Sequence, residues 1–330
     1  MCYLLVGDLH LTDRPRDAYR FEIFDWVKKQ QDKYDPKATF LMGDITDQKD
    51  RHSATLVNKT VQGLRKLGPI FILMGNHDYT DADNPFFGFL NYIDDIFFIS
   101  DPEILLGSVA VMPHIRNEEQ FQAHLRIFKE QPQRLDLLLL HNTMQGALSE
   151  TGAVLHGYKM DGIEALTLGI GCFAGDIHHP QTTGPVTYVG TPYHVRFGDN
   201  FKPRCLLVCE DGKCLDLYPD FPSKWKVTVQ TPDELFKDKR LTPGSQVKVT
   251  VELTKDEVPE WQTYKAAVTA ALSKLGVDNC GVDLKVLSSS RKASSKAPVT
   301  LKPKDIITAF CKAEKAPQLV KETGFSLLES

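Results

Sequence analysis

The sequence lacks the cysteine pattern of a disulfide framework or of a zinc ribbon. Its seven cysteines are odd in number and scattered along the chain, and they include no C-x-x-C pair. Such spacing supports neither a small disulfide-stabilised domain nor a structural zinc site. We therefore expect reduced, mostly buried thiols in a cytoplasmic protein.

Long apolar runs are also absent. No stretch approaches the roughly 18 residues that a membrane-spanning helix needs. The first apolar run reaches only Gly7, has no basic flank and is followed by Asp8, which is unlike a signal peptide. We expect no association with a membrane.

The chain has no large excess of one charge. It has 39 Lys+Arg against 43 Asp+Glu, which gives a formal net charge of -4. A strongly basic chain would have indicated nucleic acid as the partner, but this balance does not exclude it, because metal ions can neutralise a cluster of acids. Charge is unevenly spread, since residues 285–315 hold eight Lys/Arg and two acids, and the basic stretch 291–304 either binds the DNA backbone or keeps a linker soluble.

The first 80 residues alternate short apolar runs with segments of helical periodicity. The apolar runs 3–7, 38–42 and 69–74 predict strands, and 17–31 and 53–66 predict helices. This alternation predicts a parallel sheet with helices on its faces. In such sheets, ligands bind beyond the carboxyl ends of the strands.

Each of these strands is followed by residues that can bind a metal, and two later strands end in the same way. Each motif alone is weak evidence, because a single histidine after a strand is usually a satisfied polar residue. Together, in order at strand ends, the motifs predict one metal centre. They are Asp8-Leu9-His10, Gly43-Asp44-Ile45-Thr46-Asp47, Gly75-Asn76-His77-Asp78, His141 and Gly175-Asp176-Ile177-His178.

The residue types indicate hydrolysis of a phosphoester. Aspartate, histidine and asparagine offer oxygen and nitrogen ligands that suit Mn²⁺, Fe or Zn²⁺. Asp44 follows a central strand, so it is the natural carboxylate to bridge two ions. Two ions about 3.5–4 Å apart can lower the pKa of a water molecule to about 7 and hold a phosphate oxygen. A histidine beside the cluster can protonate the leaving oxygen.

The five motifs resemble those of the calcineurin-like metallophosphoesterase superfamily, over about residues 1–220. Two further segments, Arg51-His52-Ser53 and the stretch from Tyr188 to Asp199, resemble the SbcD-type DNA double-strand-break repair nucleases, including compact versions encoded by bacteriophages. The resemblance implies a four-layer α/β/β/α metallophosphoesterase sandwich followed by a small α+β capping domain. It therefore places the chain in the α/β class.

The composition shift near Pro219–Pro222 and the later polar, basic stretch divide the chain into four parts. We expect a nuclease domain at 1–222, a capping domain at 223–287, a basic linker at 288–304 and a helical segment at 305–330. The apolar residues of the last segment either dock a partner ATPase or pack on their own domain.

The resemblance also implies roles for individual residues. Metal one is expected to bind Asp8, His10, Asp44 and His178, and metal two Asp44, Asn76, His141 and Asp176. His77 serves as the acid or electrostatic partner of the leaving oxygen, and His52 contacts the substrate phosphate. Asp47 and Asp78 orient the ligands, and Arg14, Arg51 and Arg196 contact DNA phosphates. Asp176 replaces the first histidine of the usual His-x-His pattern, and its carboxylate favours the harder ion Mn²⁺.

The leading prediction is a Mn²⁺-dependent DNA exonuclease or endonuclease subunit that acts in DNA repair or recombination. The resemblance implies an SbcC-like ATPase of the ABC type as its partner, and a homodimer. One alternative is a phosphodiesterase for small molecules or cyclic nucleotides, which needs the same metal chemistry. The other is a non-enzymatic scaffold for an ATPase–DNA complex.

Overall fold

The computed structural model describes residues 2–150, 152–166, 171–209 and 213–287, together with 318 and 320. The predicted basic linker 288–304 lies outside these residues, and so does the predicted helical segment 305–330 apart from those two positions.

Four neighbouring parallel strands make up one side of a first, six-stranded sheet. Its order is β12-β11-β1-β2-β3-β4, and β11 and β12 complete it with antiparallel pairing. Ser53 accepts a hydrogen bond from the Leu56 amide at 3.1 Å and so caps α2, because a serine at this position satisfies a free amide of the first turn. The strands are β1 (Cys2–Val6), β2 (Ala38–Leu41), β3 (Ile70–Leu73), β4 (Ile96–Ile99), β11 (Cys205–Cys209) and β12 (Cys214–Leu217). The helical segments between them are η1 (Pro15–Glu22), α1 (Ile23–Tyr34), α2 (Ala54–Leu64) and η2 (Phe86–Tyr92).

A second six-stranded sheet has the order β5-β6-β7-β8-β10-β9, with parallel pairing from β6 to β10. Both of its edge strands pair antiparallel with their neighbours. The strands are β5 (Glu103–Leu105), β6 (Val109–Met112), β7 (Leu137–Leu140), β8 (Gly171–Ala174), β9 (Gln181–Thr183) and β10 (Val186–Tyr188), and the helices are α3 (Glu118–Lys129) and α4 (Asp161–Leu166).

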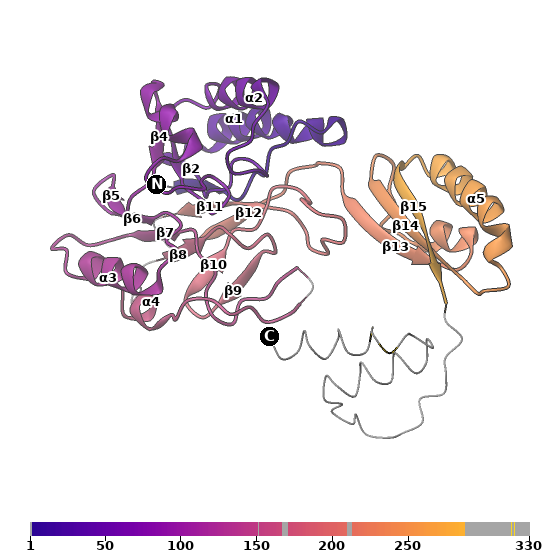
Figure 1. Ribbon diagram of the computed structural model, residues 1–330. Coiled ribbons are helices and arrows are strands. Elements are labelled where there is room, and N and C mark those ends of the chain that lie inside the picture. Colours follow the sequence, from indigo (N-terminus) through magenta and orange to yellow (C-terminus); the bar gives the residue numbers. More distant parts are fainter. Residues whose placement is uncertain are drawn as a thin grey trace. The chain divides into compact units, whose positions relative to one another are not determined.

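The two sheets pack face to face between two helical layers. Leu5 and Phe40 of the first sheet meet Val111 and Leu139 of the second in a buried inner core. Separate cores lie under α1 and α2 on one outer face and under α3 and α4 on the other. Figure 1 shows the helices on these outer faces. The predicted four-layer α/β/β/α sandwich is confirmed.

A third, three-stranded sheet follows, with the order β13-β14-β15. Side chains alternate along its strands, so that Val227 and Val249 pack with Val268 and Leu272 of the helix α5 in a core of their own. This agrees with the expected small α+β unit, while its exact limits at 223 and 287 stay a prediction. Its elements are β13 (Lys224–Val229), η3 (Pro232–Lys237), β14 (Gln246–Leu253), η4 (Val258–Glu260), α5 (Trp261–Lys274) and β15 (Asp278–Val286).

One expectation about the cysteines is wrong. Cys2 and Cys209 lie opposite each other on the antiparallel strands β1 and β11 and form a disulfide, although 207 positions separate them in sequence. Spacing along the chain could not reveal this pair, because only strand pairing brings the two residues together. Cys172 and Cys205 are buried thiols, as expected.

Within the described segments, every helix is too short or too polar to reach across a bilayer.

Candidate metal centre

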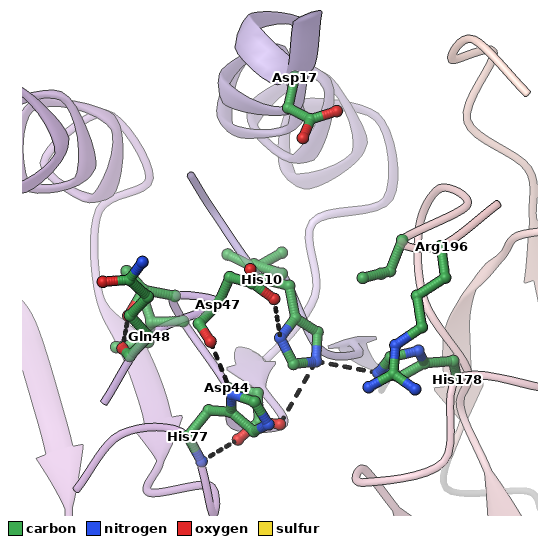
Figure 2. A network of polar contacts seen from close by, with 12 residues as sticks. His10, Asp17, Asp44, Asp47, Gln48, His77, His178 and Arg196 are labelled. Atoms are coloured by element: carbon green, nitrogen blue, oxygen red, sulfur yellow. Dashed lines mark hydrogen bonds and ion pairs between the residues drawn. The ribbon is translucent and has the colours of Figure 1, made fainter. Parts of the chain in front are cut away.

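The predicted ligands meet where strands of the two central sheets end. Because the carboxyl ends of parallel strands share one edge, and the two sheets pack together, residues from five distant segments come into one cluster. Figure 2 shows four of them, His10, Asp44, His77 and His178, directed toward one another. Asp8 and His10 follow β1, Asp44 follows β2, Asn76 and His77 follow β3, His141 follows β7, and Asp176 and His178 follow β8.

Asp44 lies at the centre of the cluster and is buried. Its Oδ2 lies 3.4 Å from His10 Nε2, and its Oδ1 lies 3.4 Å from His141 Nε2. Two groups of donor atoms that could each hold a metal share this residue, and they are His10-Asp44-His77 and Asp8-Asp44-His141. Asp44 therefore faces two ligand groups, which is the arrangement a bridging carboxylate needs.

His10 and His178 point their ring nitrogens at each other. The two Nε2 atoms lie 2.9 Å apart, and both rings are buried. Burial lowers the pKa of His10 well below its usual value, and the neighbouring His178 and His77 lower it further. Burial also lowers the pKa of His178. Both rings therefore favour the neutral form, which is the form that binds metal ions.

Several buried polar atoms of the cluster lack a hydrogen-bond partner within the described part of the chain. Asn76 donates from Nδ2 to Asp176 Oδ1 at 2.9 Å, and His141 Nδ1 lies 2.5 Å from the Met42 carbonyl oxygen. Asn76 Oδ1, His141 Nε2 and Asp8 Oδ2 have no hydrogen-bond partner among the described residues. Because an unpaired buried polar atom is costly, cations bound to these atoms fit the site.

The electrostatics of the cluster also favour bound cations. Burial raises the pKa of Asp8 well above its usual value, and the nearby Asp44 and Asp176 add to the rise. For His141, burial acts to lower the pKa, but the surrounding carboxylates Asp44, Asp8 and Asp176 outweigh it and raise the pKa to about 9. Several carboxylates thus share a buried space, where a cation relieves their mutual repulsion.

The backbone is strained at three of the ligands. His10, Asp44 and Asp176 have φ angles of 41°, 50° and 75°, in the left-handed region that other residues than glycine rarely adopt. The adjoining turn is equally tight, since a Cβ at Gly75 would lie 2.2 Å from Asp44 Oδ1. Strain of this kind is typical of functional sites, because it aims side chains where chemistry needs them.

Asp78 holds the turn that carries Asp44. Its buried carboxylate accepts hydrogen bonds from the backbone amides of Asp44 at 2.9 Å, Ile45 at 2.8 Å and Gly75 at 2.7 Å. Burial raises the pKa of Asp78 to about 7, and the nearby Asp44 contributes. Asp78 thus holds the backbone that carries Asp44, as is expected of a residue that orients a ligand.

His77 lies at the edge of the cluster and is only partly buried. Its backbone amide donates to Asp44 Oδ1 at 2.8 Å, and its Nδ1 lies 2.9 Å from the Asp47 carbonyl oxygen. The Asp47 carboxylate lies 3.8 Å from His10 Nδ1. Two backbone contacts therefore fix His77 beside His10, and its ring centroid lies 4.9 Å from that of His10.

Glu150 joins the site although the sequence did not predict it. Its Oε1 lies 3.5 Å from His178 Nδ1. From the same irregular segment, Thr143 donates to Asp176 Oδ2 at 2.5 Å. Glu150 follows no strand and belongs to no motif, so the sequence carried no signal for it.

The remaining predicted contacts lie around the cluster. His52 Nε2 lies 2.7 Å from Thr46 Oγ1 and 2.9 Å from the Gln48 carbonyl oxygen, and its ring packs against Phe86. The phosphate contact assigned to His52 stays a prediction, as do the DNA contacts of three exposed arginines. These are Arg14, Arg51 and Arg196, of which Arg196 lies beside His178 in Figure 2.

The part of the sequence that contains this cluster matches one known protein family. A family model described as calcineurin-like phosphoesterase matches residues 1–180, which is more than half of the chain. The matched range contains all the residues of the cluster. A comparison with curated proteins finds no match.

Proposed function

The chain belongs to the calcineurin-like phosphoesterase family of metal-dependent phosphoester hydrolases, and on this premise we propose that it is a nuclease that hydrolyses DNA phosphodiester bonds. The observation that carries the proposal is the buried Asp44 carboxylate, shared by two donor groups. At the edge of the cluster, the exposed Arg14 contacts Asp47 at 3.4 Å and the exposed Arg196 lies beside His178, so both can attract the phosphates of a long anionic substrate.

The donor set supports two divalent cations, and we propose Mn²⁺. When bound, such ions supply a water molecule of lowered pKa and polarise the phosphate. Asp44 would hold both ions, with Asp8, His10 and His178 as the other ligands of one ion and Asn76 and His141 as ligands of the other. The Asp176 carboxylate adds an oxygen ligand, which favours Mn²⁺ over softer ions.

His77 would act on the leaving group. When the phosphodiester breaks, the departing oxygen carries negative charge and needs a proton or a nearby positive group. His77 is partly exposed and is fixed by the Asp44 and Asp47 contacts at the edge of the cluster. An imidazole held there can donate a proton to an oxygen that leaves toward solvent.

The proposed biological setting is DNA repair or recombination, as a homodimer with an SbcC-like ATPase. Its support is the likeness of Arg51-His52-Ser53 and of the stretch from Tyr188 to Asp199 to the SbcD-type nucleases.

A hydrolysis assay with a panel of metals tests the proposal. The purified chain, freed of metal and reloaded with Mn²⁺, Mg²⁺ or Zn²⁺, is given linear duplex DNA, single-stranded DNA, bis-p-nitrophenyl phosphate and cAMP. We expect Mn²⁺-dependent cleavage of DNA, with a kcat/KM above that for cAMP. Turnover of cAMP with intact DNA would instead establish the small-molecule phosphodiesterase, and no turnover with bound metal would favour the scaffold.

A further inference from the structure

Beside the metal centre lies a basic groove. It has a volume of about 640 Å³, and the described residues that line it are five basic side chains, one acid, one phenylalanine, one valine and one proline. The basic residues come from the segment before α1, from the loop after β10 and from the third sheet. They are Arg14, Arg16, Arg196, Lys224 and Lys248.

The one acid of the groove, Asp17, is already neutralised. Lys224 Nζ lies 2.6 Å from Asp17 Oδ1, and Arg20 lies 3.8 Å from Asp17 Oδ2, with all three side chains almost fully buried. The Asp47 carboxylate also lies 3.4 Å from the exposed Arg14. The groove therefore presents an excess of positive charge, which attracts an anion.

Hydrogen bonds and ring packing hold the groove walls together. Gln246 donates from Nε2 to the Arg16 carbonyl oxygen at 2.6 Å, and the Lys224 amide donates to His194 Nδ1 at 3.1 Å. The His194 ring packs edge-on against Trp225, with their centroids 5.0 Å apart. All these residues belong to one compact unit of the chain. The cations are thus arranged by the fold, unlike isolated surface lysines.

Phe197 forms an aromatic surface in the groove. Lys248 Nζ lies 4.7 Å from the centre of its ring and Lys224 Nζ lies 5.7 Å from it, so cation–π attraction helps to place both lysines. Lys226 is the register partner of Lys248 on β13, and paired residues of parallel strands share a face. Positive charge thus extends from Arg196, which lies beside His178, to Lys248 and Lys226 of the third sheet.

We propose that this groove binds the backbone phosphates of a nucleic-acid strand whose scissile bond lies at the metal centre. The proposal rests on the proposed nuclease function and adds where the flanking strand runs. A row of cations that leads away from the centre suits a ligand with repeated phosphates, and a half-buried aromatic ring suits a base. Arg16, Arg196 and Lys248 are the expected phosphate contacts.

Binding measured without turnover tests the groove. A fluorescent single-stranded 12-mer is titrated with the full chain in chelator, and anisotropy gives the Kd over a range of salt concentrations. We expect Lys248→Glu to raise the Kd about tenfold at low salt and to reduce the slope of log Kd against log salt by about one phosphate contact. The matched control is Lys265→Glu, an exposed lysine on α5 that should leave the Kd unchanged. Thermal unfolding checks that both variants fold.

Equal Kd values for the two variants would overturn the groove assignment, even if the wild-type chain cleaves DNA with metal. Competition by a polyglutamate peptide as strong as that by the oligonucleotide would also overturn it, in favour of an acidic protein partner. If the groove binds DNA but the chain does not cleave it, the nuclease function would be refuted and the groove assignment would remain. The two proposals can therefore fail separately.

Discussion

The cluster of predicted metal ligands and the small third sheet differ in how their residues satisfy backbone preference and burial. In the cluster, buried carboxylates and imidazoles crowd together, and His10, Asp44 and Asp176 have left-handed backbones. In the third sheet, apolar residues such as Val249 face a core while Lys248 and other polar residues face away. The cluster places its side chains for chemistry by means of backbone angles that these residues disfavour. The third sheet instead satisfies both the backbone preference of a strand and the burial of apolar side chains.

This contrast indicates what stabilises each region. Bound cations would satisfy the buried atoms of the cluster that have no hydrogen-bond partner among the described residues, so metal should support its geometry. The third sheet is supported by the burial of apolar area, which requires no ion. Changes in one region should therefore leave the other largely intact, and the following predictions test that separation.

The largest effect is expected from His77→Ala. Because general acid catalysis typically contributes about 10²–10⁴-fold, kcat for DNA should fall by that factor. Calorimetry should show that Mn²⁺ affinity changes little, because the donor set of both predicted metal sites remains. Activity unchanged from the wild type would refute the role of His77, and lost metal binding would make His77 a ligand, as its position beside His10 and Asp44 allows.

Glu150→Gln should have a smaller effect. It should lower activity by weakening the affinity for the metal. The carboxylate 3.5 Å from His178 Nδ1 can orient that ring and raise its basicity, and loss of such a partner costs about 10–100-fold in metal affinity. We expect a weaker Mn²⁺ Kd by calorimetry, with kcat largely restored at saturating Mn²⁺. The exposed Glu119→Gln on α3 is the matched control. Equal affinities in the two variants would show that Glu150 has no such role.

Metal affinity should also depend on pH. The metal-free protein holds His141 protonated up to about pH 9, and this proton must leave before Nε2 can bind a cation. Affinity should therefore rise by up to about tenfold per pH unit between pH 6.5 and 8.5. The raised pKa also means that His141 stabilises the metal-free fold below about pH 6.5, and that this contribution is lost as the pH rises through about 9. Calorimetry in buffers of different ionisation enthalpy should detect proton release, and a flat pH profile would contradict the assignment.

The smallest effect on the metal centre is expected from Leu272→Ala. Leu272 is fully buried beneath the third sheet, so its truncation should cost about 2–5 kcal/mol of folding free energy in that region. Mn²⁺ affinity and turnover of bis-p-nitrophenyl phosphate should stay near the wild-type values. Chemical denaturation followed at Trp225 and Trp261 measures the first effect. A parallel loss of metal affinity would show that the two regions are coupled.

Local pattern predicted the strands that carry the ligands. The runs 3–7, 38–42 and 69–74 correspond to β1, β2 and β3, because short apolar runs between turn residues leave few other structures. The predicted helix 17–31 was less accurate, since the chain is a 3₁₀ helix over Pro15–Glu22 before α1 begins at Ile23. The strand β4 was not predicted, because the aromatic stretch around it has no clear periodicity.

The sequence by itself determined the chemistry of this protein: which residue types follow the strands, and that they suit metal ions and phosphoester hydrolysis. Only the tertiary structure decided which residues join them across long separations. The pairing of Cys2 with Cys209, the approach of Glu150 to His178 and the groove that unites Arg16 with Lys248 all depend on segments brought together by packing. Hydrophobic periodicity along the sequence shows only which nearby residues share a face of a helix or strand. The long-range contacts depend instead on how separate sheets and loops pack together.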